Sequence, residues 1–306
     1  MMHLNFRRPQ LEDRELILPY LWQVQSRSCE CTFSNVYLWS RFYVVEFAIE
    51  EDILLFKCGE GEHLFFDFPF CAKEKIRRGI ELIRAYCEAN GLPIRIGLVT
   101  PENFAVLEEL YPGEFEINYN RDSADYVYET EKLASLSGKK YHGKKNHVNK
   151  FLRTNPDWSY ESITEDNLEE CFQMALKWRN LNGCEDDEEK NAEICVTMNS
   201  LRLFKELDLR GGMLKVNGEV VAFTIGEPVS EDTMVVHIEK AFADLDGAYP
   251  MINQQFVQHE AMDYKYVNRE EDLGEEGLRQ AKLSYRPVFL VEKGMVTPRK
   301  QEEKAE

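Results

Sequence analysis

One strongly cationic segment in this acidic chain has residue types suited to binding phosphate groups. Residues 137–151, SGKKYHGKKNHVNKF, hold five lysines and two histidines, whereas the whole chain has a formal net charge of −18. Lysines act as point charges toward phosphates, and the asparagines and histidines between them supply hydrogen bonds. The alternative is a solvated helix whose lysines only offset acidic neighbours. The candidate phosphate-binding residues are Lys144, Lys145, Asn146, His147, Asn149 and Lys150.

A second candidate is a base at the end of a predicted strand. His237 and Glu239 flank Ile238 in the string HIEKAF, so a strand would direct both side chains to the same side. Such a pair can accept a proton from an attacking amine or hydroxyl. A polar pair with a purely structural role is the alternative.

The turn that follows this strand, Asp246-Gly247-Ala248, precedes a predicted helix. Backbone amides at the start of a helix bind pyrophosphate, so Gly247 is a candidate contact for a nucleotide such as coenzyme A. The turn contains only part of a glycine-rich pattern, and Asp246 would repel a pyrophosphate. An ordinary turn glycine is the alternative.

Alternating strands and helices are predicted to position these residues. In the first half, the pattern indicates a strand and a helix, three strands over 43–68, a helix over 73–90, a strand, a helix from Pro101 and two short strands over 115–129. The second half repeats the order, with helix 142–154, strand 158–162, helices 165–182 and 186–206, three strands including a hairpin at Asn217-Gly218, a helix, a strand, a short helix and one closing strand.

Length and composition limit the class of protein. A chain of 306 residues predicts two domains, which we place at 1–133 and 134–296, followed by a flexible charged tail at 297–306. The net charge argues against binding nucleic acid in bulk. The eight cysteines lack a CxxC pair and the six histidines lack metal-site spacing, so we expect reduced thiols and no metal. Without a signal peptide or an apolar run near ~20 residues, we expect a cytoplasmic protein with no membrane span.

Several strings together carry a resemblance to a known family. KKNHVNKF, DGAYPMINQQF and NREEDLGEEGLRQAK resemble the bacterial family that includes the C-terminal catalytic domain of phosphatidylglycerol lysyltransferases. The resemblance spans nearly the whole chain and extends more distantly to Fem-type peptidyltransferases. It implies an α+β fold of two tandem GNAT-like acyltransferase domains, each a mostly antiparallel mixed sheet flanked by helices.

The resemblance also implies a third set of site residues. The positions that match the family string are Asn268, Asp272, Lys282, Ser284 and Tyr285. Acid, base and hydroxyl groups in one strand–loop–helix suit orienting an aminoacyl group and polarising its ester carbonyl. We assign Lys282 as the polarising or nucleotide-contacting cation, and Asp272 to ammonium binding or proton transfer. The alternative is that Asp272 caps the short helix and Lys282 is exposed.

The expected activity is transfer of an aminoacyl group from aminoacyl-tRNA to a lipid or a small hydroxyl or amine acceptor, without a tightly bound cofactor. The second half is favoured as the active half, because all matching strings lie there. One alternative is an acetyl-CoA-dependent N-acyltransferase, which requires the Gly247 turn to bind pyrophosphate. The other is a non-catalytic protein that binds an RNA end or a nucleotide.

Overall fold

The chain forms two compact units in a computed structural model that describes residues 4–184 and 187–299. The first unit comprises the described residues up to Gln25, Trp39–Ala124 and those from Val291 onward. The second comprises the described parts of Ser26–Leu38 and Asp125–Leu290. The predicted division at residue 133 differs from these units: it assigns residues 26–38 to the first domain, whereas the structure places them in the second unit.

The first unit is built on a six-stranded sheet. Its strands lie in the order β1 (Val45–Glu50), β2 (Ile53–Cys58), β3 (Phe65–Asp67), β4 (Ile96–Val99), β13 (Gly294–Pro298) and β5 (Phe115–Tyr119), with helices α1 (Arg14–Gln23), α3 (Ile76–Asn90) and α4 (Pro101–Leu110). The only parallel pairing described in this sheet is β3 with β4. Helix α3 buries the predicted stripe of Ile76, Ile80 and Ile83, and it ends at Gly91, which is left-handed with φ of 64°.

The second unit is built on a seven-stranded sheet. Its order is β12 (Phe289–Val291), β6 (Asp125–Glu129), β11 (Tyr266–Asn268), β10 (Thr233–Ala241), β9 (Glu219–Ser230), β8 (Arg210–Val216) and β7 (Trp158–Ser162). Its helices are α2 (Phe33–Trp39), α5 (Thr130–Ser135), α6 (His142–Thr154), α7 (Leu168–Leu181), α8 (Glu188–Arg202), α9 (Ala248–Glu260) and α10 (Glu276–Leu283). Strands β10 and β11 are parallel, and the other described registers in this sheet are antiparallel. The predicted class, mostly antiparallel mixed sheets flanked by helices, is therefore confirmed.

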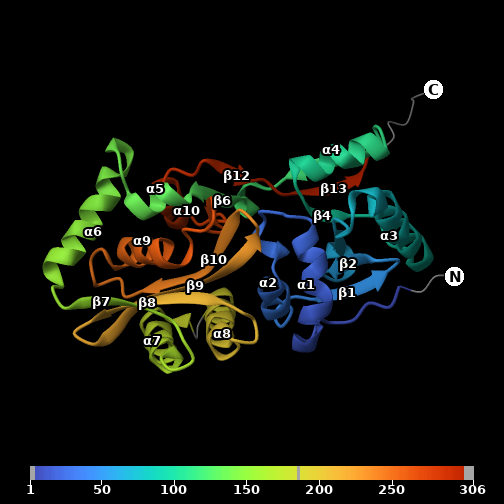
Figure 1. The fold of residues 1–306 in the computed structure, drawn as a ribbon. Helices are drawn as coiled ribbons and strands as arrows, with labels where there is room; N and C mark the ends of the chain where they lie inside the picture. Colours follow the sequence, from blue (N-terminus) through green and yellow to red (C-terminus); the bar gives the residue numbers. More distant parts are fainter. Residues whose placement is uncertain (1–3, 185–186, 300–306) are drawn as a thin grey trace. The chain divides into compact units, whose positions relative to one another are not determined.

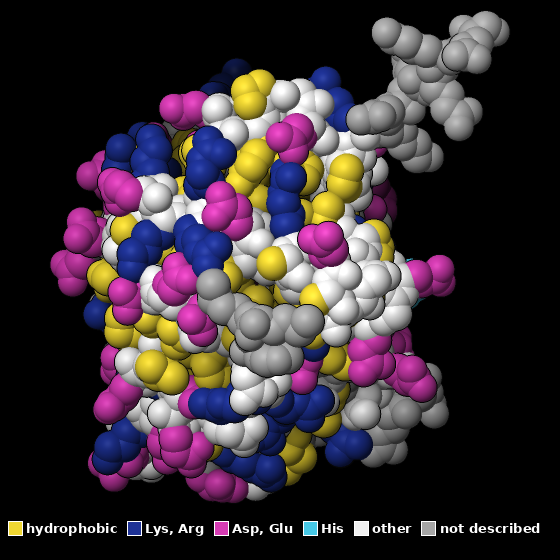
Figure 2. All heavy atoms as spheres, turned by 90° about the vertical axis from the view of Figure 1, so that its right-hand side faces the viewer, with side chains coloured by type: hydrophobic (Ala, Val, Ile, Leu, Met, Phe, Trp, Pro, Cys, Tyr) yellow, Lys and Arg dark blue, Asp and Glu magenta, His cyan; other side chains and the backbone are white. Residues whose placement is uncertain are grey.

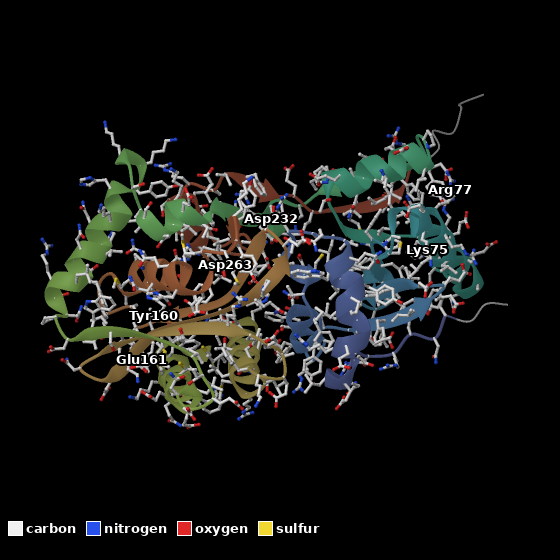
Figure 3. All side chains as sticks on the ribbon, in the orientation of Figure 1. Lys75, Arg77, Tyr160, Glu161, Asp232 and Asp263 are labelled. Atoms are coloured by element: carbon white, nitrogen blue, oxygen red, sulfur yellow. The ribbon has the colours of Figure 1, made fainter. Side chains whose placement is uncertain are left out.

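Helices cover both faces of the seven-stranded sheet. Helix α9 packs on β8, β9 and β10, and α5 and α6 pack on α9 in turn. Figure 1 shows α7 and α8 on the other face of these strands, where α7 contacts β9 and β10. At the edge strand β7, Tyr160 reaches α9, because its hydroxyl lies 3.2 Å from the Glu260 carboxylate (Figure 3). Across the described residues, no helix is both long enough and apolar enough to cross a bilayer.

The predicted elements agree with the structure where local signals are strong. Helix α6 and strand β7 have the expected bounds, and the hairpin turn has left-handed Asn217 and Gly218, with φ of 52° and 81°. The two strands expected over 115–129 do not pair, because β5 and β6 belong to different sheets. The single closing strand is likewise two strands, β12 and β13, and helix α2 was not predicted. Strand β13 includes Thr297 and Pro298 of the expected tail, and residues 300–306 lie outside the described residues.

Replacing Gly226 with alanine is expected to destabilise the second unit. The added methyl carbon would lie 2.2 Å from the backbone carbonyl oxygen of Val235 on the neighbouring strand, so β9 and β10 would have to move apart. We expect a loss of about 1–3 kcal/mol in the free energy of unfolding, measured by urea titration. As the control, the methyl group of Gly143→Ala would meet no atom of another described element within 4 Å, so this variant should stabilise by up to about 1 kcal/mol. Equal stability of both variants would contradict this account of the sheet.

Candidate functional site

Five consecutive residues that begin at the last residue of strand β11, Asn268–Asp272, send their side chains to four different polar clusters in the second unit. Asn268 and Glu271 face the Cys29–Asp125 region, since Asn268 donates to Asp125 at 2.8 Å and the Cys29 thiol lies 3.6 Å from Glu271. Arg269, Glu270 and Asp272 each bind a different partner, described below. Glu270 is left-handed with φ of 58°, which lets successive side chains diverge. This segment therefore organises the site.

The ammonium of Lys282 binds the main chain of this segment. Lys282 is 8% exposed, and its Nζ donates to the backbone carbonyl of Arg269 at 2.6 Å and to that of Glu271. Its own carbonyl accepts a hydrogen bond from the Tyr128 hydroxyl at 2.8 Å. Burial lowers the pKa of Lys282. The predicted substrate-facing cation is thus bonded to the main chain, and its direct effect is to position residues 269–271.

Asp272 anchors the end of the same segment. Its fully buried carboxylate accepts two hydrogen bonds from Arg279, at 2.9 and 2.6 Å, and one from the Gly274 amide at 3.0 Å. The Tyr126 hydroxyl donates to it as well. The Arg279 hydrogen bonds hold the pKa of Asp272 well below its usual range, although burial opposes them. Asp272 is therefore a fixed anion that ties the loop to α10.

We call the residues Lys144, Glu239, Asn253, Arg269 and Tyr285 the Arg269 cluster. The Arg269 guanidinium donates to Glu239 at 2.8 Å, and Asn253 donates to the other Glu239 oxygen at 3.0 Å. Lys144 Nζ lies 4.1 Å from the centroid of the Tyr285 ring, and the Arg269 guanidinium carbon lies 4.7 Å from it. Burial, followed by the charge of Arg269, lowers the pKa of Lys144.

The Arg269 cluster has the properties of an anion-stabilising site. It holds two cations and one carboxylate, and these side chains are half-buried or buried. Arg269 Nη1 is buried and has no hydrogen-bond partner among the described residues. Because an unsatisfied buried donor costs free energy, Nη1 is available to bind a group that enters the cluster. Donors and cations in such a setting stabilise negative charge that develops on an oxygen.

His237 lies in a second cluster, where its partners are Glu227 and Glu270 and not Glu239. Its Nδ1 lies 2.7 Å from Glu270 and its Nε2 3.0 Å from Glu227, and the β9–β10 register shifts around it. Burial lowers the pKa of His237, but hydrogen bonds to the two glutamates outweigh burial and raise it to about 10. His237 is thus an imidazolium at neutral pH with both N–H groups in use. The predicted histidine–glutamate base is not assembled in this form.

Helix α6 presents its predicted cationic face to solvent. Lys145, Asn146 and Asn149 are exposed, whereas Val148 and Phe151 are buried. Figure 3 shows nitrogen-tipped side chains projecting outward along this helix. Three of the candidate phosphate-binding residues are therefore accessible to solvent.

The Gly247 turn is closed by α6. Asp246 is paired with Lys150 and lies 3.4 Å from His147 Nδ1, and a methyl group on Gly247 would lie 2.4 Å from the His147 carbonyl oxygen. Few amides at the start of α9 are available, because Ala248 N–H donates to Leu245, Met251 N–H donates to Gly247, and Pro250 has no N–H. This arrangement does not suit pyrophosphate binding.

The other predicted residues have structural partners. Asn268 is fully buried and also donates to the Arg27 carbonyl at 2.7 Å, and Ser284 donates to the Ala281 carbonyl. Sequence reasoning missed Glu227, Asn253, Arg269 and Glu270. For Arg269 and Glu270 a signal was available. They lie in the charged run NREED at the end of a short strand, where the sheet fixes the positions of side chains.

The described residues form two mixed-sheet units flanked by helices, and the second unit holds the Arg269 cluster. The family described as "Phosphatidylglycerol lysyltransferase, C-terminal" matches residues 22–296, and the chain belongs to this family. The predicted resemblance is confirmed.

Individual proteins are similar to this chain in sequence or in fold. A crystal structure of a conserved protein of unknown function from Bacteroides thetaiotaomicron is 37% identical, with a TM-score of 0.91 over 97% of this chain and 100% of that chain. The structure of L-PGS from Bacillus licheniformis shares the fold at 15% identity, with a TM-score of 0.66 over 97% of this chain and 94% of that chain. An uncharacterized protein of Mycoplasmoides gallisepticum is 23% identical over 180 residues, which are 58% of this chain and 57% of that protein.

The His237 assignment predicts a pH dependence. Since its pKa is raised from 6.5 to about 10, its contribution to stability is complete below pH 6.5 and is lost as the pH rises through about 10. Imidazole nitrogen chemical shifts should report an imidazolium at pH 8. In Glu270→Gln, which removes one carboxylate, the pKa should fall. A neutral His237 at pH 8 in the unmodified protein would contradict the assignment.

Proposed function

We propose that this chain transfers an aminoacyl group from aminoacyl-tRNA to a lipid or to a small hydroxyl or amine acceptor. The observation that supports this proposal is the Arg269 cluster, where Lys144 and Arg269 approach one Tyr285 ring beside the Glu239 carboxylate. Lys144 also belongs to the basic helix α6, so one helix links the cluster to a phosphate-binding surface. That link suits a donor whose reactive ester is attached to a polyanion.

The reaction needs no co-reactant beyond the donor and the acceptor. The acceptor oxygen or nitrogen attacks the ester carbonyl and forms a new bond, and the bond from the carbonyl carbon to the terminal ribose oxygen breaks. The proton lost by the acceptor ends on the ribose hydroxyl. In this scheme Glu239 accepts the acceptor proton, and Arg269 Nη1 and Lys144 stabilise the oxyanion that forms during attack.

The exposed cations of α6 bind the phosphates of the acceptor end, as predicted for Lys145 and Lys150. The remainder of the protein does not favour polyanions, given its net charge of −18. Figure 2 shows one face on which lysines and arginines are interspersed with acidic side chains. A local basic helix on such a protein favours one bound segment of nucleic acid over coating of its surface.

An acyl-CoA donor has less support. Coenzyme A requires amides at the start of α9 to bind its pyrophosphate, but those of Ala248 and Met251 are bonded to carbonyls and Pro250 has none. The acidic Asp246, which pairs with Lys150, lies beside the same turn. We therefore favour the tRNA ester as the donor.

Lys144→Met is expected to reduce transfer strongly, with Lys145→Met as the matched control. Both variants remove one cation from α6, but only Lys144 contacts Tyr285 in the cluster. We expect kcat to fall about 100-fold or more for Lys144→Met, as when one oxyanion donor is lost, whereas Lys145→Met should change mainly KM. The assay follows radiolabel from a pool of charged tRNAs, and separately from acetyl-CoA, into a lipid and metabolite extract.

The two donors separate the candidate functions. Label that leaves tRNA and depends on Lys144 supports the proposal. Label that leaves only acetyl-CoA would overturn it in favour of N-acyl transfer. Binding of tRNA without any transfer would overturn it in favour of a non-catalytic protein.

A further inference from the structure

Two polar side chains beneath helix α9 are buried and have hydrogen-bonding atoms without partners. Asn253 is 1% exposed and Thr224 is 0% exposed. Asn253 Oδ1 and Thr224 Oγ1 have no hydrogen-bond partner among the described residues. Leaving such a group unsatisfied costs free energy, so two of them beside one carboxylate require an explanation.

Both residues neighbour the same carboxylate, that of Glu239. Thr224 on β9 is directly opposite Glu239 on β10 in the register, so their side chains are neighbours on one face of the sheet. Asn253 on α9 donates to Glu239 Oε2 at 3.0 Å, which identifies this face as the one covered by α9. The amide orientation of Asn253 is fixed, because only its NH₂ group can donate to the carboxylate. Its carbonyl oxygen must therefore point elsewhere.

We infer that Asn253 Oδ1, Thr224 Oγ1 and the Glu239 carboxylate form a subsite for the free α-ammonium group of the aminoacyl substrate. This inference rests on the proposed function. An ammonium group carries three N–H donors, and the subsite offers three oxygen acceptors of two kinds, neutral and charged. Buried oxygens without a hydrogen-bond partner are otherwise costly, and an ammonium could donate to all three oxygens.

The neighbouring charges are compatible with a bound cation. Lys144 and Arg269 carry two positive charges beside Glu239, but the adjacent His237 cluster contributes a net negative charge through Glu227 and Glu270. With His237 as an imidazolium, the formal charges of these six groups sum to zero. An ammonium that enters at Glu239 also places the ester carbonyl, two bonds away, near Arg269, where the oxyanion forms.

The subsite predicts a substrate requirement. An aminoacyl group with a free amine should bind, whereas an N-acetylated one should be rejected. Acetylation removes the charge and two of the donors, and it adds a group that the buried acceptors cannot solvate.

Thr224→Val tests the inference, because it removes only the hydroxyl and keeps the shape of the side chain. Removing an unsatisfied buried hydroxyl should raise the thermal unfolding midpoint by about 2–4 °C. It should also weaken binding of an L-amino acid methyl ester by about 10- to 100-fold, measured by calorimetry. Thr130→Val is the matched control, since Thr130 Oγ1 is also buried and without a partner but lies on α5. This control should gain stability and leave ester binding unchanged.

The probes are the methyl esters of several L-amino acids and their N-acetylated forms. Binding of the free amines alone, weakened by Thr224→Val, supports the subsite. Equal binding of both forms, no effect of Thr224→Val, or no binding of any ester would overturn it. Because the binding assay uses no tRNA, its result is separate from the transfer assay, in which an active enzyme that accepts N-acetylated aminoacyl-tRNA would overturn the subsite alone.

Discussion

The site depends on one buried ammonium, that of Lys282, bonded to the backbone carbonyls of Arg269 and Glu271. A buried lysine is costly unless its donors are used, and here the main chain supplies the acceptors. This contact and the Asp272–Arg279 pair hold the segment after β11 in a conformation that includes a left-handed Glu270. The Arg269 and Glu270 side chains reach β10 because the segment is held in this way.

The polar groups around this segment divide into two kinds. His237, Asp272 and Asn268 have partners that account for their burial. Arg269, Asn253 and Thr224 each keep one buried atom without a hydrogen-bond partner in the described part of the chain. Proteins satisfy buried polar groups as a rule, so these three exceptions around Glu239 support the proposed ligand site.

Much of the fold could be predicted from the sequence, because its signals are local. The stripe of Val148 and Phe151 gives the bounds of α6, and Asn217-Gly218 gives the β8–β9 hairpin. The sequence did not predict that β5 and β6 join different sheets, since strand pairing depends on contacts far apart in the chain. Lys144 and Tyr285 were both predicted as site residues. Their contact and the participation of Asn253 could not be predicted for the same reason, because both depend on the packing of α6 and α9 in the folded unit.

The central claim is that aminoacyl transfer occurs at Glu239 within the Arg269 cluster. The most direct measurement is the single-turnover rate of transfer from aminoacyl-tRNA to a lipid extract for the unmodified protein and for Glu239→Gln, which keeps the shape but removes the charge. The account predicts a rate at least about 100-fold lower in the variant, with tRNA binding unchanged. Transfer at the original rate by Glu239→Gln, or no transfer by the unmodified protein, would contradict it.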